Sequence, residues 1–174
     1  MRMNVKVIER DVLNPLADRD AVKLDITPMP ESIGRISLFD NTKPNADLIL
    51  NIVENKLDNS LLFNHPKKPA GAPATIEQIE EAAESDVSIL ALGDCGSCTT
   101  WVILDALRLE KKGTPTISIC SSKFANFAHE LAEAHGMSDL RIMEIGHPIA
   151  GQSPEQVKMK VEHIIPEIQK MLKI

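Results

Sequence analysis

Residues 86–101, DVSILALGDCGSCTTW, decide the fold of this chain. The first seven, Asp86 to Leu92, form an apolar run with the length of a strand that is buried on both faces. Gly93 and Asp94 break this run, and a helix-like stretch follows over residues 101–112. A buried strand that turns directly into a helix is the repeating unit of a parallel α/β sheet.

Strand-like and helix-like segments alternate in the same way through residues 34–174. We expect strands at 35–40, 60–64, 86–92, 114–120 and 140–145. We expect helices at 44–57, 75–85, 101–112, 123–135 and 153–172, the last of them bent or interrupted at Pro166. The sequence therefore predicts one three-layer α/β domain at 34–174, with a mostly parallel sheet of about five strands, flavodoxin-like or Rossmann-like. Residues 1–33 are expected to form an N-terminal arm.

The composition excludes several classes of protein. A chain of 174 residues is long enough for one well-cored domain. Its formal net charge of −6 argues against nucleic-acid binding, which needs a basic face. No apolar run approaches the roughly 18 residues of a membrane helix, so no membrane association is expected. Three cysteines, two of them spaced as C-x-x-C, favour a reducing compartment, and we expect a cytoplasmic protein.

The turn Cys95-Gly96-Ser97-Cys98 concentrates the reactivity of the chain. Both sulfurs are expected near a helix N-terminus, where backbone N–H groups and the helix dipole stabilise a thiolate. A second thiol close by can trap the first as a disulfide. Two other interpretations stay open, a pair of small buried residues or half of a zinc site. Zinc needs two more ligands, and the chain has only Cys120 and isolated histidines to supply them, so no metal is expected. We expect no other cofactor either.

Polar residues also follow other strands at the carboxyl edge, where open α/β sheets bind ligands. The segment 40–47, DNTKPNAD, could hold a ligand carboxylate or could simply make a turn and cap a helix. His147 could act as an acid or base, or could be merely solvated. Asp94 could assist Cys95 or cap the helix. If the first and third strands are neighbours, Lys43 would place a positive charge beside the Cys95 thiolate.

At the cysteine turn, the chain resembles the UGSC family of (seleno)proteins, named for a selenocysteine-Gly-Ser-Cys motif. The segments 40–47 and Gly146-His147-Pro148 extend the resemblance over most of residues 34–160. More distantly, the family is similar to the selenocysteine-bearing substrate-activating subunits of glycine- and betaine-type reductases. In those subunits a selenolate attacks carbon, displaces a leaving group and is later released by reduction. The resemblance implies that Cys95, in place of selenocysteine, is the nucleophile and that Cys98 is the resolving thiol.

We therefore expect a thiol-dependent reductase or lyase that acts on a small electrophilic substrate, with a thioredoxin-like protein as reductant. The expected catalytic residues are Cys95, Cys98, Asp94 and His147. The residues expected to bind the substrate are Asp40, Asn41, Lys43, Asn45, Gly96, Ser97 and Thr99. Two other functions stay open: a dithiol–disulfide oxidoreductase or redox sensor acting on proteins, and a non-catalytic subunit whose 1–33 arm docks a partner. A homo-oligomer or a partner subunit is possible with any of the three.

Overall fold

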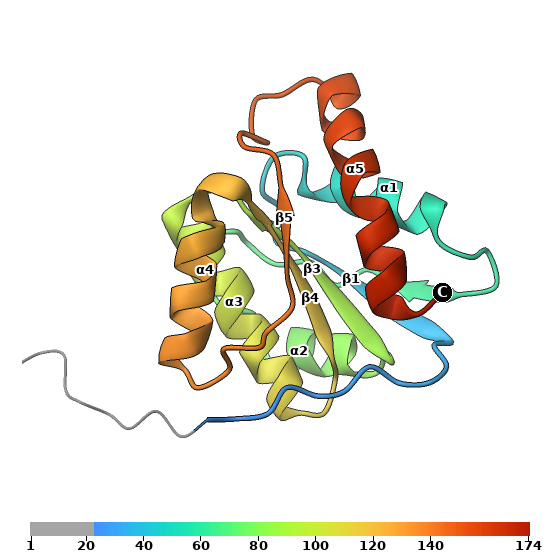
Figure 1. Ribbon diagram of the computed structural model, residues 1–174, viewed down its shortest axis with the longest axis vertical. Coiled ribbons are helices and arrows are strands. Elements are labelled where there is room, and N and C mark those ends of the chain that lie inside the picture. The colour runs from blue at the N-terminus through green and yellow to red at the C-terminus, as the bar shows by residue number, and fades with distance from the viewer. Residues whose placement is uncertain (1–22) are drawn as a thin grey trace, which may run out of the picture.

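A five-stranded parallel sheet forms the centre of the structure, a computed structural model that describes residues 23–174 (Figure 1). The strands are β1 (Arg35–Asp40), β2 (Leu62–Asn64), β3 (Val87–Gly93), β4 (Thr116–Ser121) and β5 (Ile142–Ile145). Their order in the sheet is β2-β1-β3-β4-β5, and every neighbouring pair is parallel. This order is flavodoxin-like, so the predicted fold class is confirmed, and the first and third strands are neighbours.

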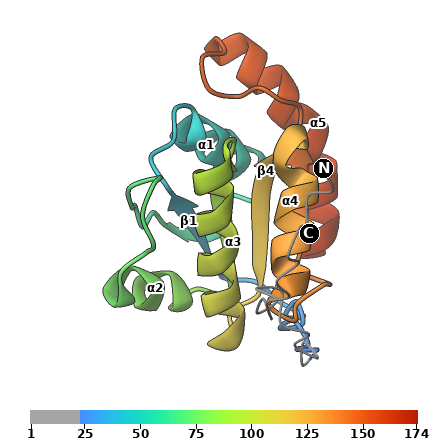
Figure 2. The same ribbon diagram turned by 90° about the vertical axis from the view of Figure 1, so that its left-hand side faces the viewer.

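Helices cover both faces of the sheet and complete a three-layer architecture. The helices are α1 (Ala46–Lys56), α2 (Ile76–Ala83), α3 (Gly96–Lys111), α4 (Ser122–Ala134) and α5 (Pro154–Leu172). Helices α1 and α5 lie on one face, and α2, α3 and α4 lie on the other, as the two orthogonal views show (Figures 1 and 2). Capping boxes begin two of these helices, at Thr75 before α2 and at Ser153 before α5.

Two aliphatic clusters hold the three layers together. Strand β3 is buried along its whole length, and its apolar side chains reach both clusters. Ile89 packs on the side of α1 and α5, whereas Leu90 packs on the side of α2, α3 and α4. Full burial of each such side chain stabilises the fold by roughly 1.5–3 kcal/mol. This burial fixes β3, and hence the turn that follows it, at the centre of the carboxyl edge.

The start of α3 and the course of α5 differ from the predictions. Helix α3 begins at Gly96 rather than at Trp101, because Cys95 caps it and compensates for the weak helix propensity of glycine, serine and threonine. Helix α5 runs unbroken through Pro166, so the predicted interruption is wrong. Buried isoleucines on both sides of the proline, Ile164, Ile165 and Ile168, pack against the core and keep the helix intact.

The described part of the N-terminal arm crosses the amino edge of the sheet. The Thr27 N–H donates to Glu110 Oε2 at 2.7 Å, and its carbonyl accepts from Arg141 Nη2 at 2.7 Å. Leu24 and Ile26 pack against the cluster under α3 and α4. Residues 1–22 of the predicted arm lie outside the described residues. Among residues 23–174, no helix combines the length and the apolar character needed to cross a membrane.

Candidate functional site

The two cysteines of the turn occupy different positions at the start of α3. Cys95 is the N-cap residue, and its Sγ accepts from the Cys98 N–H at 3.4 Å. Cys98 lies inside the first turn and is 1% exposed, whereas Cys95 is only half-buried. The two sulfurs form a disulfide across a Cα–Cα distance of 5.4 Å. The turn therefore presents one reachable sulfur and one shielded sulfur that are close enough to bond.

Gly93 and Thr99 fix the position of the turn against β4. The Thr99 hydroxyl donates to the Cys95 carbonyl at 2.7 Å, and the Thr99 N–H donates to the same oxygen at 3.0 Å. A Cβ added at Gly93 would stand 2.7 Å from Cys120 Sγ and 2.9 Å from Thr99 Oγ1, so this position has no room for a side chain. Burial raises the pKa of the Cys120 thiol to about 12, which keeps this third cysteine protonated.

Lys43 is the charged side chain that reaches the disulfide. Its Nζ lies 3.7 Å from Cys95 Sγ, across the boundary between the segment after β1 and the turn after β3. Ser97 adds a second polar contact, with its hydroxyl 3.6 Å from the same sulfur. In the reduced protein, a positive charge at this distance favours the thiolate form of Cys95 over the thiol.

The two asparagines of the 40–47 segment are bonded to the backbone. Asn41 is 1% exposed; its Nδ2 donates to the Leu92 carbonyl at 2.9 Å and its Oδ1 accepts from the Leu92 N–H at 2.9 Å. Leu92 lies where the register between β3 and β4 shifts, so Asn41 replaces the missing strand partner. The Nδ2 of Asn45 donates to the carbonyls of Ile149 and Gln152 at 2.9 and 3.2 Å. Asn41 therefore holds the end of β3, and Asn45 holds the loop between β5 and α5.

Asp94, His147 and Ser121 form a hydrogen-bonded group beside the cysteine turn. His147 Nδ1 lies 3.0 Å from Asp94 Oδ1 and 3.1 Å from Ser121 Oγ. Asp94 Oδ2 accepts from the N–H groups of Ala150 and Ile149 at 2.8 and 3.2 Å. An imidazole whose Nδ1–H donates to a carboxylate has its unprotonated nitrogen at Nε2, where it can accept a proton.

The environment of Asp94 keeps its carboxylate ionised. Burial raises the pKa of this group, but the Ala150 N–H, the Ser121 hydroxyl, the Ile149 N–H and the charge of His147 together outweigh it. The pKa of Asp94 therefore lies below its ordinary value. The result is a fixed negative charge adjacent in sequence to Cys95 and bonded to His147.

The connection between β2 and α2 is pinned to α3 by a buried ion pair. Lys68 Nζ lies 2.6 Å from Asp105 Oδ2, and the two side chains are 2% and 0% exposed. Burial lowers the pKa of Lys68, and the hydrogen bond and charge of Asp105 oppose this effect only in part. The Lys68 N–H donates to the Asp40 carbonyl, and its carbonyl accepts from the Thr42 hydroxyl. Lys68 therefore braces the segment that carries Lys43.

The structure brings most of the predicted site residues to one edge of the sheet. The residues that lie there with the cysteines are Lys43, Asp94, Ser97 and His147. Gly96 is exposed at the first position of α3. Asp40 is buried beneath the edge, and its Oδ1 accepts from the Thr42 N–H at 2.7 Å.

Sequence reasoning assigned no role to Ser121 and did not find the Lys68–Asp105 pair. Ser121 is the last residue of β4, and its place at the carboxyl edge could have indicated that it belongs to the site. Lys68 and Asp105 are 37 residues apart and share no motif, so no sequence pattern indicates their pairing. Within residues 23–174, no group of three or more His, Cys, Asp or Glu side chains is arranged to hold a metal ion.

Comparison with known protein families identifies a family for this chain. No curated protein matches the chain. The profile of the UGSC family matches residues 11–174, which include every residue of the candidate site. The chain therefore belongs to the UGSC family.

Proposed function

We propose that this protein is a thiol-dependent enzyme in which Cys95 attacks a small electrophilic substrate and Cys98 resolves the adduct. The observation that carries the proposal is the asymmetry of the two sulfurs. Cys95 is half-buried at the N-cap of α3, and its sulfur is 3.7 Å from the Lys43 ammonium. Cys98 is 1% exposed and is linked to Cys95 by the disulfide. A reachable, electrostatically stabilised thiolate with a shielded partner suits attack followed by intramolecular resolution.

The proposed reaction is a reductive displacement. The Cys95 thiolate attacks the carbon of a substrate R–X, forms an S–C bond and expels X⁻. The Cys98 thiolate then attacks Cys95 Sγ, forms the disulfide and breaks the S–C bond, and the released carbanion takes up a proton to give R–H. The substrate gains two electrons, which the two thiols supply. A thioredoxin-like dithiol returns two electrons to the disulfide and completes the cycle.

The neighbouring charged groups have separate roles in this scheme. Lys43 stabilises the Cys95 thiolate and attracts an anionic end of the substrate. The exposed start of α3 at Gly96 and Ser97 offers backbone N–H groups to the same end. His147, oriented by Asp94, moves the proton that the leaving group or the carbanion requires. Four of the residues expected to bind the substrate instead hold the backbone of the site through hydrogen bonds of their side chains. They are Asp40, Asn41, Asn45 and Thr99.

A dithiol–disulfide oxidoreductase or redox sensor that acts on proteins is the second candidate. Gly96 and Ser97 are both exposed next to Cys95, so a protein thiol could approach the disulfide without first entering a deep pocket. This candidate needs the same two cysteines and differs in having no carbon–sulfur intermediate.

Trapping of the covalent adduct tests the proposal and separates the two candidates. The reduced protein is incubated with phenacyl bromide, an α-halo ketone, and its intact mass is followed over time. We expect the wild type to release acetophenone and to lose two hydrogens as the disulfide forms. Cys98→Ser should instead accumulate a stable phenacyl adduct on Cys95. If neither protein forms an adduct or releases acetophenone, while the wild type exchanges disulfides with protein thiols, the second candidate is correct.

A further inference from the structure

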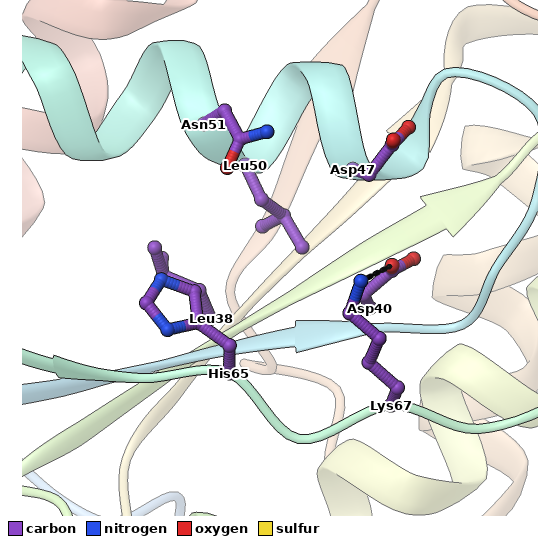
Figure 3. A pocket seen from close by; sticks show the side chains of 7 residues that line it. All are labelled: Leu38, Asp40, Asp47, Leu50, Asn51, His65 and Lys67. Carbon is purple, nitrogen blue, oxygen red and sulfur yellow. Dashed lines mark ion pairs between the residues drawn. The ribbon is translucent and has the colours of Figure 1, made fainter.

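A cavity of about 250 Å³ lies between α1, β1 and the segment that follows β2, and the residues that line it are separate from the cysteine turn (Figure 3). Asp47, Leu50 and Asn51 line it from α1, where their i, i+3 and i+4 spacing places them on one side of the helix. Leu38 and Asp40 line it from β1. The cavity therefore has an apolar wall made by two leucines and a polar end made by two carboxylates.

The carboxylate of Asp40 is buried at the polar end and is incompletely bonded. Its side chain is 6% exposed, and Oδ1 accepts from the Thr42 N–H. Oδ2 is 3.5 Å from Lys67 Nζ, an ion pair drawn in Figure 3 that is longer than a charge-assisted hydrogen bond. A buried carboxylate oxygen with only this loose partner retains the capacity to accept a stronger bond.

The charges around the cavity sum to a negative value. Asp40 and Asp47 lie at one end, and among residues 23–174 Lys67 is the only lysine or arginine that lines the space. His65 also lines it, and its Nε2 is 2.7 Å from Glu54 Oε2, which brings a third carboxylate next to the wall. Even with His65 protonated, three carboxylates face two cations, and with His65 neutral they face one. A cation is therefore the ligand that this cavity favours.

We propose that this cavity binds the ammonium group of a small aliphatic amine between Asp40 and Asp47, with its carbon chain against Leu38 and Leu50. The Lys67 ammonium beside Asp40 indicates that the carboxylate accepts this type of charge. A hard metal ion is less suited, because it prefers six or more oxygen ligands. The small volume limits the ligand to a few carbon atoms. This binding site is distinct from the thiol chemistry proposed for Cys95.

Amide chemical-shift titration tests the site with three probes of equal chain length. ¹⁵N-labelled full-length protein is titrated at fixed ionic strength and pH with n-butylammonium chloride, sodium butyrate and n-butanol. We expect saturable shifts with the ammonium alone, at about millimolar Kd for so small a ligand, on the amides of residues 38–40, 47–51 and 65–67.

Three single substitutions sharpen the test. Asp47→Asn should weaken butylammonium binding about threefold to tenfold, because it removes an exposed charge partner. Lys67→Gln keeps most of the side-chain stem but removes the competing cation, so binding should tighten by about a similar factor. Asp58→Asn removes an exposed acid beyond the C-terminal end of α1 and should leave the Kd unchanged.

The proposal stands if binding is saturable, selective for the cation and shifted in opposite directions by Asp47→Asn and Lys67→Gln. It is overturned if the three probes act alike, if the shifts map elsewhere, or if the two variants bind as the wild type does. None of these results depends on the reactivity of Cys95, so this site and the proposed function fail independently.

Discussion

At the scale of single residues, the three cysteines differ in what surrounds each sulfur. Cys95 is half-buried beside Lys43, Cys98 is covered by the first turn of α3, and Cys120 is buried in β4 with a pKa raised to about 12. A thiolate needs both access and a stabilising charge to react. Among the described residues, these two conditions meet at Cys95 alone.

Lys43→Gln should make Cys95 less reactive at neutral pH without affecting the fold. Loss of a positive charge 3.7 Å from the sulfur should raise the pH midpoint of Cys95 alkylation. The free energy of unfolding should change by less than about 0.5 kcal/mol, because a partly exposed loop lysine contributes little to the fold. Alkylation rates measured from pH 5 to 10, with Lys170→Gln as the matched control, check this expectation. An unchanged midpoint would show that the 40–47 segment is only a turn and helix cap.

Gly93→Ala should destabilise the protein by about 1–3 kcal/mol, because the added methyl group overpacks the space next to β4. The new Cβ would lie 2.7 Å from Cys120 Sγ and 3.3 Å from Thr99 Cα. Cys120→Ala removes the first of these contacts but leaves the second, so it should rescue the variant in part. A urea-denaturation double-mutant cycle measures the coupling between the two positions. Strictly additive effects would contradict the contact.

Asp94→Asn should cost about 1–3 kcal/mol at pH 7, because it removes a buried charge that accepts two backbone N–H bonds. The pKa of Asp94 is lower in the folded protein than its ordinary value of 3.8. Its charge therefore stabilises the fold above pH 3.8, and this contribution is lost as the pH falls through the lower folded pKa. The stability difference from wild type should shrink toward pH 2. Asp139→Asn, at an exposed position, is the control and should change stability little at any pH. If the stability difference between Asp94→Asn and wild type stayed constant from pH 7 to pH 2, the charge effect would be contradicted.

The placement of Lys43 beside Cys95 could be predicted from the sequence, whereas the roles of the asparagines could not. Two polar segments that follow neighbouring strands must meet at the carboxyl edge, and this rule needs only the strand order. Whether Asn41 bonds a ligand or the Leu92 backbone depends on the register shift between β3 and β4, which no local pattern reports.

At the scale of elements, strong periodicity predicted the strands and helices better than their ends. Strand β3 is a continuous apolar run, and its buried position follows directly from that composition. The start of α3 was placed five residues too late, because Gly96 and Ser97 have weak helix propensity and the cap made by a cysteine sulfur leaves little trace in sequence. The Lys68–Asp105 pair was not foreseen, since only the folded chain brings the two residues together.

Lys68→Met should destabilise the protein by about 3–5 kcal/mol, because it leaves the Asp105 carboxylate buried beside a single, partly exposed Arg108. Lys67→Gln, one residue earlier, alters a side chain that is 62% exposed and should change stability by less than about 0.5 kcal/mol. Chemical denaturation of both variants makes the comparison. Equal stabilities would show that the β2–α2 connection is not held by this pair.

At the scale of the whole molecule, the two edges of the sheet have different tasks. The carboxyl edge carries the cysteines, Lys43 and the Asp94–His147 pair. The amino edge carries Glu110, whose fully buried carboxylate accepts hydrogen bonds from Thr27, Thr116 and Arg141. These bonds join the described arm to α3, β4 and the segment before β5. Stability and reactivity should therefore respond to different substitutions.

Glu110→Gln should destabilise the fold by about 3–5 kcal/mol, because Arg141 loses its charged partner in a buried ion pair. The rate of Cys95 alkylation under native conditions should stay at the wild-type value, since the substitution lies at the opposite edge. Urea denaturation and alkylation kinetics on the same samples test both parts. A large fall in the alkylation rate of the folded variant would mean that the two edges are coupled.

Timed alkylation of the reduced wild-type protein tests the central claim most directly. The protein is exposed to substoichiometric iodoacetamide at pH 7, quenched at intervals, digested and mapped by mass spectrometry. The account predicts that Cys95 is labelled first and at least about tenfold faster than Cys98, while Cys120 stays unlabelled in the folded protein. Faster labelling of Cys98 would contradict the account, because it would make the shielded thiol the nucleophile and Cys95 its partner.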